Sequence, residues 1–322
     1  MLEIPAGRRD GQSSINKFGC NESISTGSDP EDIWDGGGLW VPPTAARIHD
    51  IASTVATDVG ALISSGTAST GGTTTTLVDT SANFVGDGVA AGDTVLNDTT
   101  YEHSVVISVT ATVLTLHKTR HGGIWAEADA YRVVNASSTG ASVTHIFGLD
   151  SNMEPLEEFI IMNGTTNVPT LSTYWRVYRM HVDGAASRTA TNEGVITATA
   201  QTDATVTAQI NVGNGQTLMA VYTVPAGKTA YMTRLYASIT KSGGSAAAAD
   251  VALWETPFAS TDGSGSRVVH FDGITTNGSG FITQDFKPYK QFLEQTDIWI
   301  RVQEVSATVG VTGGFDIILE DD

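Results

Sequence analysis

The feature that most constrains the fold is a strand–turn–strand pattern at residues 222–239. Pro225 and Gly227 mark a tight turn, because proline presets φ for one turn position and glycine accepts a positive φ. After the turn the side chains alternate, so that Tyr231, Leu235 and Ile239 fall on one face of the segment. A period of two is typical of a β-strand. This pattern predicts β-structure and opens the densest β-region of the chain.

Similar short runs, separated by glycine-rich turns, fill the rest of the chain and predict an all-β fold. Eight of them predict a two-sheet jelly roll at residues 214–322. Residues 46–64 and 140–213 predict a β-sandwich, although the stretch at 46–63 also fits a helical stripe. Residues 65–139 begin with a Thr/Gly-rich run and have matching small-residue edges, which predicts a small β-barrel-like module inserted into a hairpin loop of the sandwich.

The first 45 residues have little periodicity and are expected to form an extended arm. Phe18, Trp34 and Trp40 are spaced through it. An arm without a core of its own is ordered only if it lies on its own domains or on a partner chain, and the sequence leaves both open. Cys20 is the single cysteine of the chain, so no intrachain disulfide forms. We expect it to be a small buried hydrophobe.

Composition limits the partners. The 322 residues carry 35 acidic and 17 basic side chains, a net charge of −18. Nucleic-acid binding depends on clustered Lys and Arg, so direct nucleic-acid binding is not expected. The N-terminus lacks a signal-peptide pattern, and no run approaches the roughly 20 apolar residues of a membrane span. We therefore expect no membrane insertion and synthesis in a cytoplasm.

Two candidate metal sites are weak. His117 and His121 have ligand-like spacing, but Lys118 and Arg120 beside them would oppose a cation, which favours a solvated turn. The acidic loop at residues 29–32, with Asp35, lacks the spacing of a dedicated calcium loop. The sequence therefore predicts neither a metal nor a cofactor.

Catalytic and sugar-binding readings are also weak. A glycosidase needs two carboxylates in a cleft, whereas Glu157 and Glu158, close to Glu154, point to opposite faces of a predicted strand. No nucleophile-elbow motif and no phosphate-binding glycine loop occurs. Trp254 and Trp299 could bind a glycan if they are exposed, and core or subunit packing is the simpler interpretation. We expect no enzymatic activity and no catalytic residues.

Three segments resemble a known protein family. They are residues 16–23 with 32–38 (NKFGCNES and DIWDGGG), residues 222–231 (YTVPAGKTAY), and residues 76–95 of the expected insert. They resemble uncharacterised virion structural proteins of tailed, often marine, bacteriophages. The resemblance covers about a third of the chain. It implies a particle component and transfers no catalytic residue.

The sequence therefore predicts a non-enzymatic phage structural protein, either a capsid-associated decoration or a head–tail accessory component. We expect the arm to dock on a neighbouring subunit or another virion protein, with assembly contacts at Phe18, Cys20, Trp34 and Trp40. The β-domains are expected to form a symmetric homo-oligomer, a trimer, within the virion. The alternatives are a host-glycan or receptor-binding protein on the tail or a head fibre, with contacts at Trp254 and Trp299, and a particle-bound hydrolase.

Overall fold

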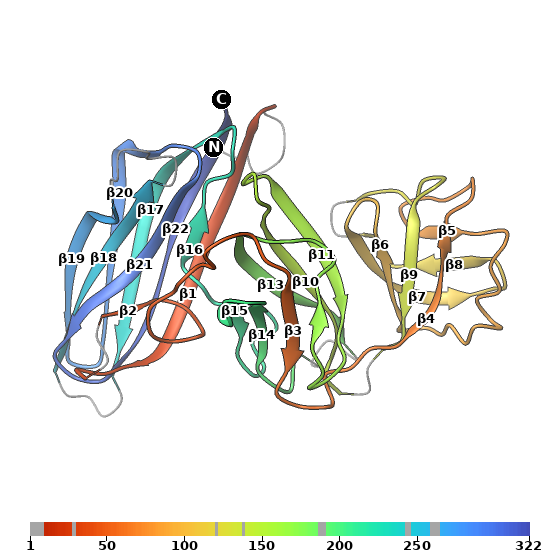
Figure 1. Ribbon diagram of the computed structural model, residues 1–322, viewed down its shortest axis with the longest axis horizontal. Coiled ribbons are helices and arrows are strands. Elements are labelled where there is room, and N and C mark those ends of the chain that lie inside the picture. The colour runs from red at the N-terminus through yellow and green to blue at the C-terminus, as the bar shows by residue number, and fades with distance from the viewer. Residues whose placement is uncertain are drawn as a thin grey trace.

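The computed structural model describes residues 10–27, 30–119, 122–136, 139–185, 191–241, 246–257 and 265–322. Every regular element in these ranges is a β-strand, so the all-β prediction is confirmed. None of the described segments is a helix with the length and hydropathy needed to cross a membrane. The strands form three units in a row, with a jelly roll at one end, a sandwich in the middle and a small module at the other end (Figure 1).

The jelly roll consists of two antiparallel sheets that enclose one apolar core. The first sheet has the order β1 (Gln12–Ile24), β22 (Val309–Asp321), β17 (Lys228–Thr240) and β20 (Ser279–Phe292). The second has the order β16 (Val221–Thr223), β21 (Thr296–Val305), β18 (Ala247–Pro257) and β19 (Arg267–Thr276), and β2 (Glu31–Asp32) also pairs with β21. The chain passes between the sheets in the order of a double Greek key, as in a jelly roll.

The predicted extended arm is wrong for Gln12–Ile24, which form a strand of the jelly roll, whereas residues 33–45 belong to no strand. Strand β1 runs antiparallel to β22, from the pair Gln12–Glu320 to the pair Ile24–Val309. It is therefore an edge strand of the jelly roll, whose backbone hydrogen bonds are made within the same chain. The strand was not predicted from the sequence because its inward positions include Lys17 and Gly19, which break the apolar alternation expected of a strand.

Residues 33–220 are inserted between two short strands, β2 and β16, that share one strand position of the jelly roll. Strand β21 pairs first with β2 and, further along the same edge, with β16, which follows β2 by nearly 190 residues. A hydrogen bond connects the two ends of the inserted segment: the amide of Ala220 donates to the carbonyl of Ile33 over 2.9 Å. Strand β1 crosses this junction at Gly19, where a Cβ would lie 2.4 Å from the backbone nitrogen of Ala220. Glycine is required here by the close approach of the backbones.

The middle unit is a sandwich of a three-stranded and a four-stranded sheet. The three-stranded sheet has the order β11 (Pro155–Ile161), β10 (Ala141–Leu149) and β13 (Arg176–Ala185). The other has the order β12 (Val168–Pro169), β3 (His49–Ser53), β14 (Ile196–Ala200) and β15 (Thr205–Ile210). Its core also includes Trp34, Trp40 and Trp299, so the apolar interior continues into the jelly roll.

The third unit is a six-stranded sheet with its own core. Its order is β4 (Leu62–Thr67), β9 (Ala130–Val134), β6 (Thr94–Asn97), β7 (Glu102–Val109), β8 (Val113–Leu116) and β5 (Thr76–Val78). The amide of Ser69, just after edge strand β4, donates a hydrogen bond of 2.7 Å to the carbonyl of Val78 in the other edge strand, β5. This contact makes the sheet a partly closed barrel. The sheet begins and ends within a few residues of the predicted insert at 65–139 and leaves the sandwich between β3 and β10.

Candidate functional site

The tryptophans predicted to be docking contacts lie inside the molecule. Trp34 and Trp40 are 5% and 7% exposed. Each indole nitrogen donates to a carbonyl of the same chain, at Gly38 over 3.2 Å and at Thr207 over 3.1 Å. Both rings pack within the apolar core of the sandwich. In this fold they are therefore not free to bind a neighbouring chain.

The two residues suggested for glycan binding are not an exposed platform either. Trp254 and Trp299 stack on each other, with ring centroids 6.1 Å apart. The Arg301 guanidinium lies over both rings, at 5.1 and 5.5 Å from their centroids. Trp299 is only 6% exposed, and both rings pack against the core of the sandwich. Packing between units, the simpler interpretation, is therefore what the structure shows.

Phe18 and Cys20, in contrast, lie on the outer face of the first jelly-roll sheet. One cross-strand row along this face contains Cys20, Thr312, Ser238 and Phe281. The next row contains Phe18, Gly314, Tyr236 and Thr283. We call these eight residues the uncharged face. Phe281 is 81% exposed, while Phe18 and Cys20 are half-buried. Burial, together with the nearby Glu22 and Asp35 carboxylates, raises the pKa of the Cys20 thiol.

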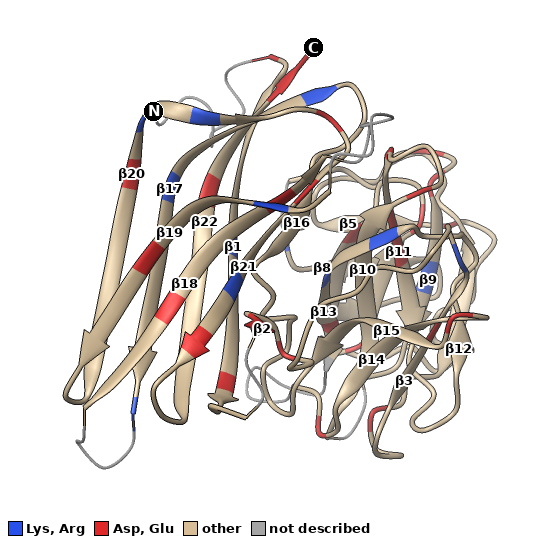
Figure 2. Ribbon diagram, turned by 60° about the vertical axis from the view of Figure 1, so that its left-hand side comes forward, with Lys and Arg blue, Asp and Glu red and all other residues tan. Residues whose placement is uncertain are grey.

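A row of polar and charged residues borders the uncharged face. It contains Asn16, Asp316, Arg234 and Asp285. Asn16 donates to Asp316 over 2.6 Å, and Arg234 pairs with Asp285 over 2.9 Å. Figure 2 shows that Lys and Arg are scattered over the described strands and do not gather in one stripe. The uncharged face is thus a limited area on a strongly acidic protein.

The acidic residues weighed in the sequence have separate partners. Asp32 is fully buried and pairs with Arg301 over 2.6 Å, while Asp35 accepts the amide of Leu218 over 3.1 Å. Burial outweighs the hydrogen bonds to Asp35 and raises its pKa to about 6. Asp29 and His121 lie outside the described residues. Glu158 accepts the amide of Leu171 over 2.8 Å.

Sequence reasoning missed a cluster of histidines and carboxylates where the module meets the sandwich. Asp183 faces the Nδ1 atoms of three imidazoles: it accepts hydrogen bonds from His181 at 2.7 Å and His145 at 3.0 Å, and it lies 3.3 Å from Nδ1 of His103. His181 and Asp183 belong to β13, His145 to the facing position of β10, and His103 to β7 of the module. Three strands from two units thus bring these side chains together.

The cluster is enclosed by carboxylate and aromatic groups. Glu157 Oε2 lies 3.1 Å from Nε2 of His145, on the side away from Asp183. Phe147 and Phe159 flank the His145 ring, with centroids 4.0 and 4.1 Å away. The side chains of His145 and Asp183 are each 5% exposed. Such a site holds charge in a poorly hydrated environment.

The ionisation of the cluster follows from these contacts. Burial opposes the charged form of His145, but the hydrogen bond to Asp183 and the nearby Glu157 carboxylate outweigh it and raise the pKa of His145. Burial likewise opposes the charge of Asp183, and the hydrogen bonds from His145 and His181 outweigh it and lower the pKa of Asp183. Burial lowers the pKa of His103. The sequence offered one clue: in His181-Val-Asp183, the two polar residues share a strand face.

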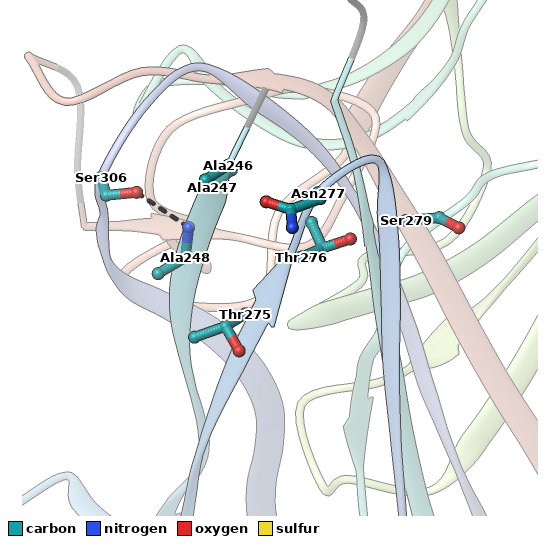
Figure 3. Close-up of a pocket in the computed structure, with 8 residues that line it drawn as sticks. All are labelled: Ala246, Ala247, Ala248, Thr275, Thr276, Asn277, Ser279 and Ser306. Atoms are coloured by element: carbon teal, nitrogen blue, oxygen red, sulfur yellow. Dashed lines mark hydrogen bonds between the residues drawn. The ribbon is translucent and has the colours of Figure 1, made fainter. Parts of the chain in front are cut away.

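The jelly roll also has a small polar pocket at one end (Figure 3). It has a volume of about 600 Å³ and is lined by residues 246–248, 275–277, 279 and 306. Ser306 Oγ accepts the amide of Ala248 over 2.8 Å across its rim. The lining side chains are alanines, hydroxyls and one amide, with neither an aromatic ring nor a charge among them. This lining favours neither sugar stacking nor catalysis.

Comparisons with known proteins assign no relative. No protein-family model matches the chain. No curated protein matches it. Among solved structures, the chain is weakly similar to the mosquito-larvicidal Cry4Aa toxin from Bacillus thuringiensis, with 6% sequence identity and a TM-score of 0.14. The alignment covers 72% of this chain and 52% of the toxin chain, so the chain spans about half the length of that protein. A TM-score this low carries no argument about fold or function.

Proposed function

We propose that the chain is a non-enzymatic structural component of a tailed-bacteriophage particle, either a capsid decoration or a head–tail accessory protein. Its partners are other virion proteins and copies of itself, arranged as a symmetric trimer. It is made in the host cytoplasm and carried in the virion. The sequence resemblance supports this proposal, and two of the three resembling segments meet in space. Residues 16–23 and 32–38 form β1 and the insertion junction, beside the β16–β17 segment.

The observation that carries the proposal is the uncharged face. Phe281 leaves 81% of its surface in water, although the protein has an apolar core available. A net charge of −18 makes like-charged surfaces repel, so association requires an area where acidic groups are few. The uncharged face provides such an area, on four long strands that are hydrogen-bonded side by side. Phe18 and Cys20 remain assembly contacts in this proposal, whereas Trp34 and Trp40 do not.

The oligomeric part is tested by light scattering on the full chain and on two matched variants. We expect the wild type to have the mass of three chains. Phe281→Ser should weaken self-association about 10- to 100-fold, because burying one phenylalanine contributes roughly 1.5–3 kcal/mol. Leu171→Ser is the control, since Leu171 is 91% exposed but lies in the sandwich, outside the uncharged face. A monomeric wild type, or equal effects of the two substitutions, would refute the role of this face.

The particle assignment is tested separately by electron microscopy. Antibodies raised against the purified chain should label intact phage particles that carry its gene, at regularly repeated positions on the head or neck. Labelling that is absent from intact particles but present in the lysate would remove the structural role. This result is independent of the oligomer test, because a virion protein could attach as a monomer.

A further inference from the structure

We propose that His145, His181 and Asp183 bind a Zn²⁺ ion, and that His103 of the module, which lies outside this three-residue set, becomes the fourth ligand after a movement of its side chain. Nδ1 or Nε2 of each histidine and a carboxylate oxygen of Asp183 lie within 4.8 Å of one another in the three-residue set. Imidazole nitrogen and carboxylate oxygen are ligands that zinc takes at about 2.0–2.2 Å. In a tetrahedral site, bonds of that length separate neighbouring ligand atoms by about 3.3 Å.

Each of the three histidines places Nδ1 no more than 3.3 Å from an oxygen of Asp183. Nδ1 of His103 and Nδ1 of His145 lie 3.3 and 3.0 Å from Asp183 Oδ2. His181 Nδ1 lies 2.7 Å from the other oxygen, Oδ1. All three histidines thus present the same ring nitrogen to one carboxylate. A small movement of the side chains would place a cation between these atoms in place of the hydrogen bonds.

The surroundings of His145 point independently to a metal. A histidine ligand usually donates its second ring N–H to a carboxylate, which fixes the tautomer and the ring orientation. Glu157 Oε2 is 3.1 Å from Nε2 of His145, near enough to become that acceptor after a small rotation, although Nε2 makes no hydrogen bond in the structure. Phe147 and Phe159 enclose the ring and limit the access of water. A candidate ligand, a carboxylate beside its second ring nitrogen and an apolar shell are therefore all present.

The origin of the ligands indicates what the ion does. His145 and His181 belong to paired strands of the sandwich, and His103 belongs to β7 of the inserted module. Zinc bound by all four residues would crosslink the module to the sandwich. This role is structural, because every position of a four-coordinate ion would be filled by protein.

The test uses the full chain, stripped with EDTA and titrated with ZnCl₂ in a calorimeter. We expect one equivalent of Zn²⁺ per chain, a higher thermal midpoint, and no binding of Mg²⁺. Asp183→Asn and His181→Gln should abolish the site, and Glu157→Gln should weaken it about 10- to 100-fold. The control is His117→Gln, since His117 is an exposed histidine of the module outside the cluster. Co²⁺ should give the visible bands of a tetrahedral complex.

The fourth ligand has its own readout. In the wild type, Zn²⁺ should slow amide hydrogen exchange in β7. His103→Gln should still bind one equivalent, more weakly, and should lose that protection; an unchanged affinity would remove His103 from the site. Absence of saturable binding, or binding that survives both Asp183→Asn and His181→Gln in folded protein, would overturn the proposal. The cluster would then be a hydrogen-bonded network only.

Discussion

Removal of one partner of the ion pair between Arg176 and Asp297 should destabilise the protein strongly, because the pair lies buried where the sandwich joins the jelly roll. Arg176 begins β13, and Asp297 is in β21. The guanidinium donates twice to the carboxylate, from Nε to Oδ1 and from Nη2 to Oδ2, each over 2.9 Å. The two side chains are 4% and 7% exposed. Thr223 adds a third hydrogen bond to Asp297, over 2.6 Å.

Asp297→Ala should lower the free energy of unfolding by about 3–5 kcal/mol, since it leaves the Arg176 charge buried without its counter-ion. The pair as a whole need not stabilise the fold to that extent, because both ions were taken out of water on folding. The double variant Arg176→Met/Asp297→Ala should therefore be more stable than Asp297→Ala alone.

A pair of the same geometry that is less buried provides the control. Arg132 donates to Asp98 from Nε and Nη2 over 2.8 and 2.7 Å, but these side chains are 27% and 30% exposed. Asp98→Ala should cost less than about 1 kcal/mol. Urea unfolding would be followed by circular dichroism and tryptophan fluorescence, because two probes reveal whether the units unfold separately. If Asp297→Ala lowers the free energy of unfolding no more than Asp98→Ala does, then burial does not determine how much the loss of one partner destabilises the protein.

Three further results are expected. Burial lowers the pKa of His49 to about 4 from 6.5, so the free energy of unfolding should fall as the pH drops from 6.5 toward 4. His49→Gln should remove about 2 kcal/mol of the stability change between pH 7.5 and 5. Gly19→Ala should destabilise the chain by at least about 3 kcal/mol, because the Cβ would strike backbone, whereas Gly27→Ala, with open space around it, should change little. Burial lowers the pKa of Lys17 to about 7, so stability should rise by about 2 kcal/mol from pH 7 to 9, and Lys17→Met should abolish the rise.

Each of the three results has a direct measurement that could contradict it. The two pH effects would be measured as wild-type and variant unfolding curves at both pH values, and parallel pH dependence in variant and wild type would refute them. The two glycine variants would be compared in one buffer, and equal stability would mean that the strands separate at Gly19 without cost.

Local patterns predicted the β-content and many of the strands correctly. The strand–turn–strand at 222–239 has its turn at Pro225–Gly227, between β16 and β17. The change in texture near residue 65 also coincides with the start of the six-stranded module. These predictions succeed because turn residues and a period of two depend on neighbours in the sequence.

The candidate sites were less accessible. Phe18 and Cys20 were singled out from the sequence, but the uncharged face depends on the register that brings Phe281 into the row of Cys20. The motif His181-Val-Asp183 predicts that two polar residues share a face, and nothing in it indicates His103, nearly 80 residues earlier. Such groups meet only because β10 pairs with β13 and the module packs beside them.

Alternation and turn chemistry are local properties, so the chain could be assigned to the all-β class, with an insert, without knowledge of its fold. The place of the first strand in the last domain follows only from contacts between distant parts of the chain. Strand β1 forms its hydrogen bonds with β22, about 300 residues away, and its buried Lys17 and Gly19 conceal the apolar pattern of an inward face. Pairing between distant strands is selected by the packing of the whole core, and no short stretch of sequence contains that information.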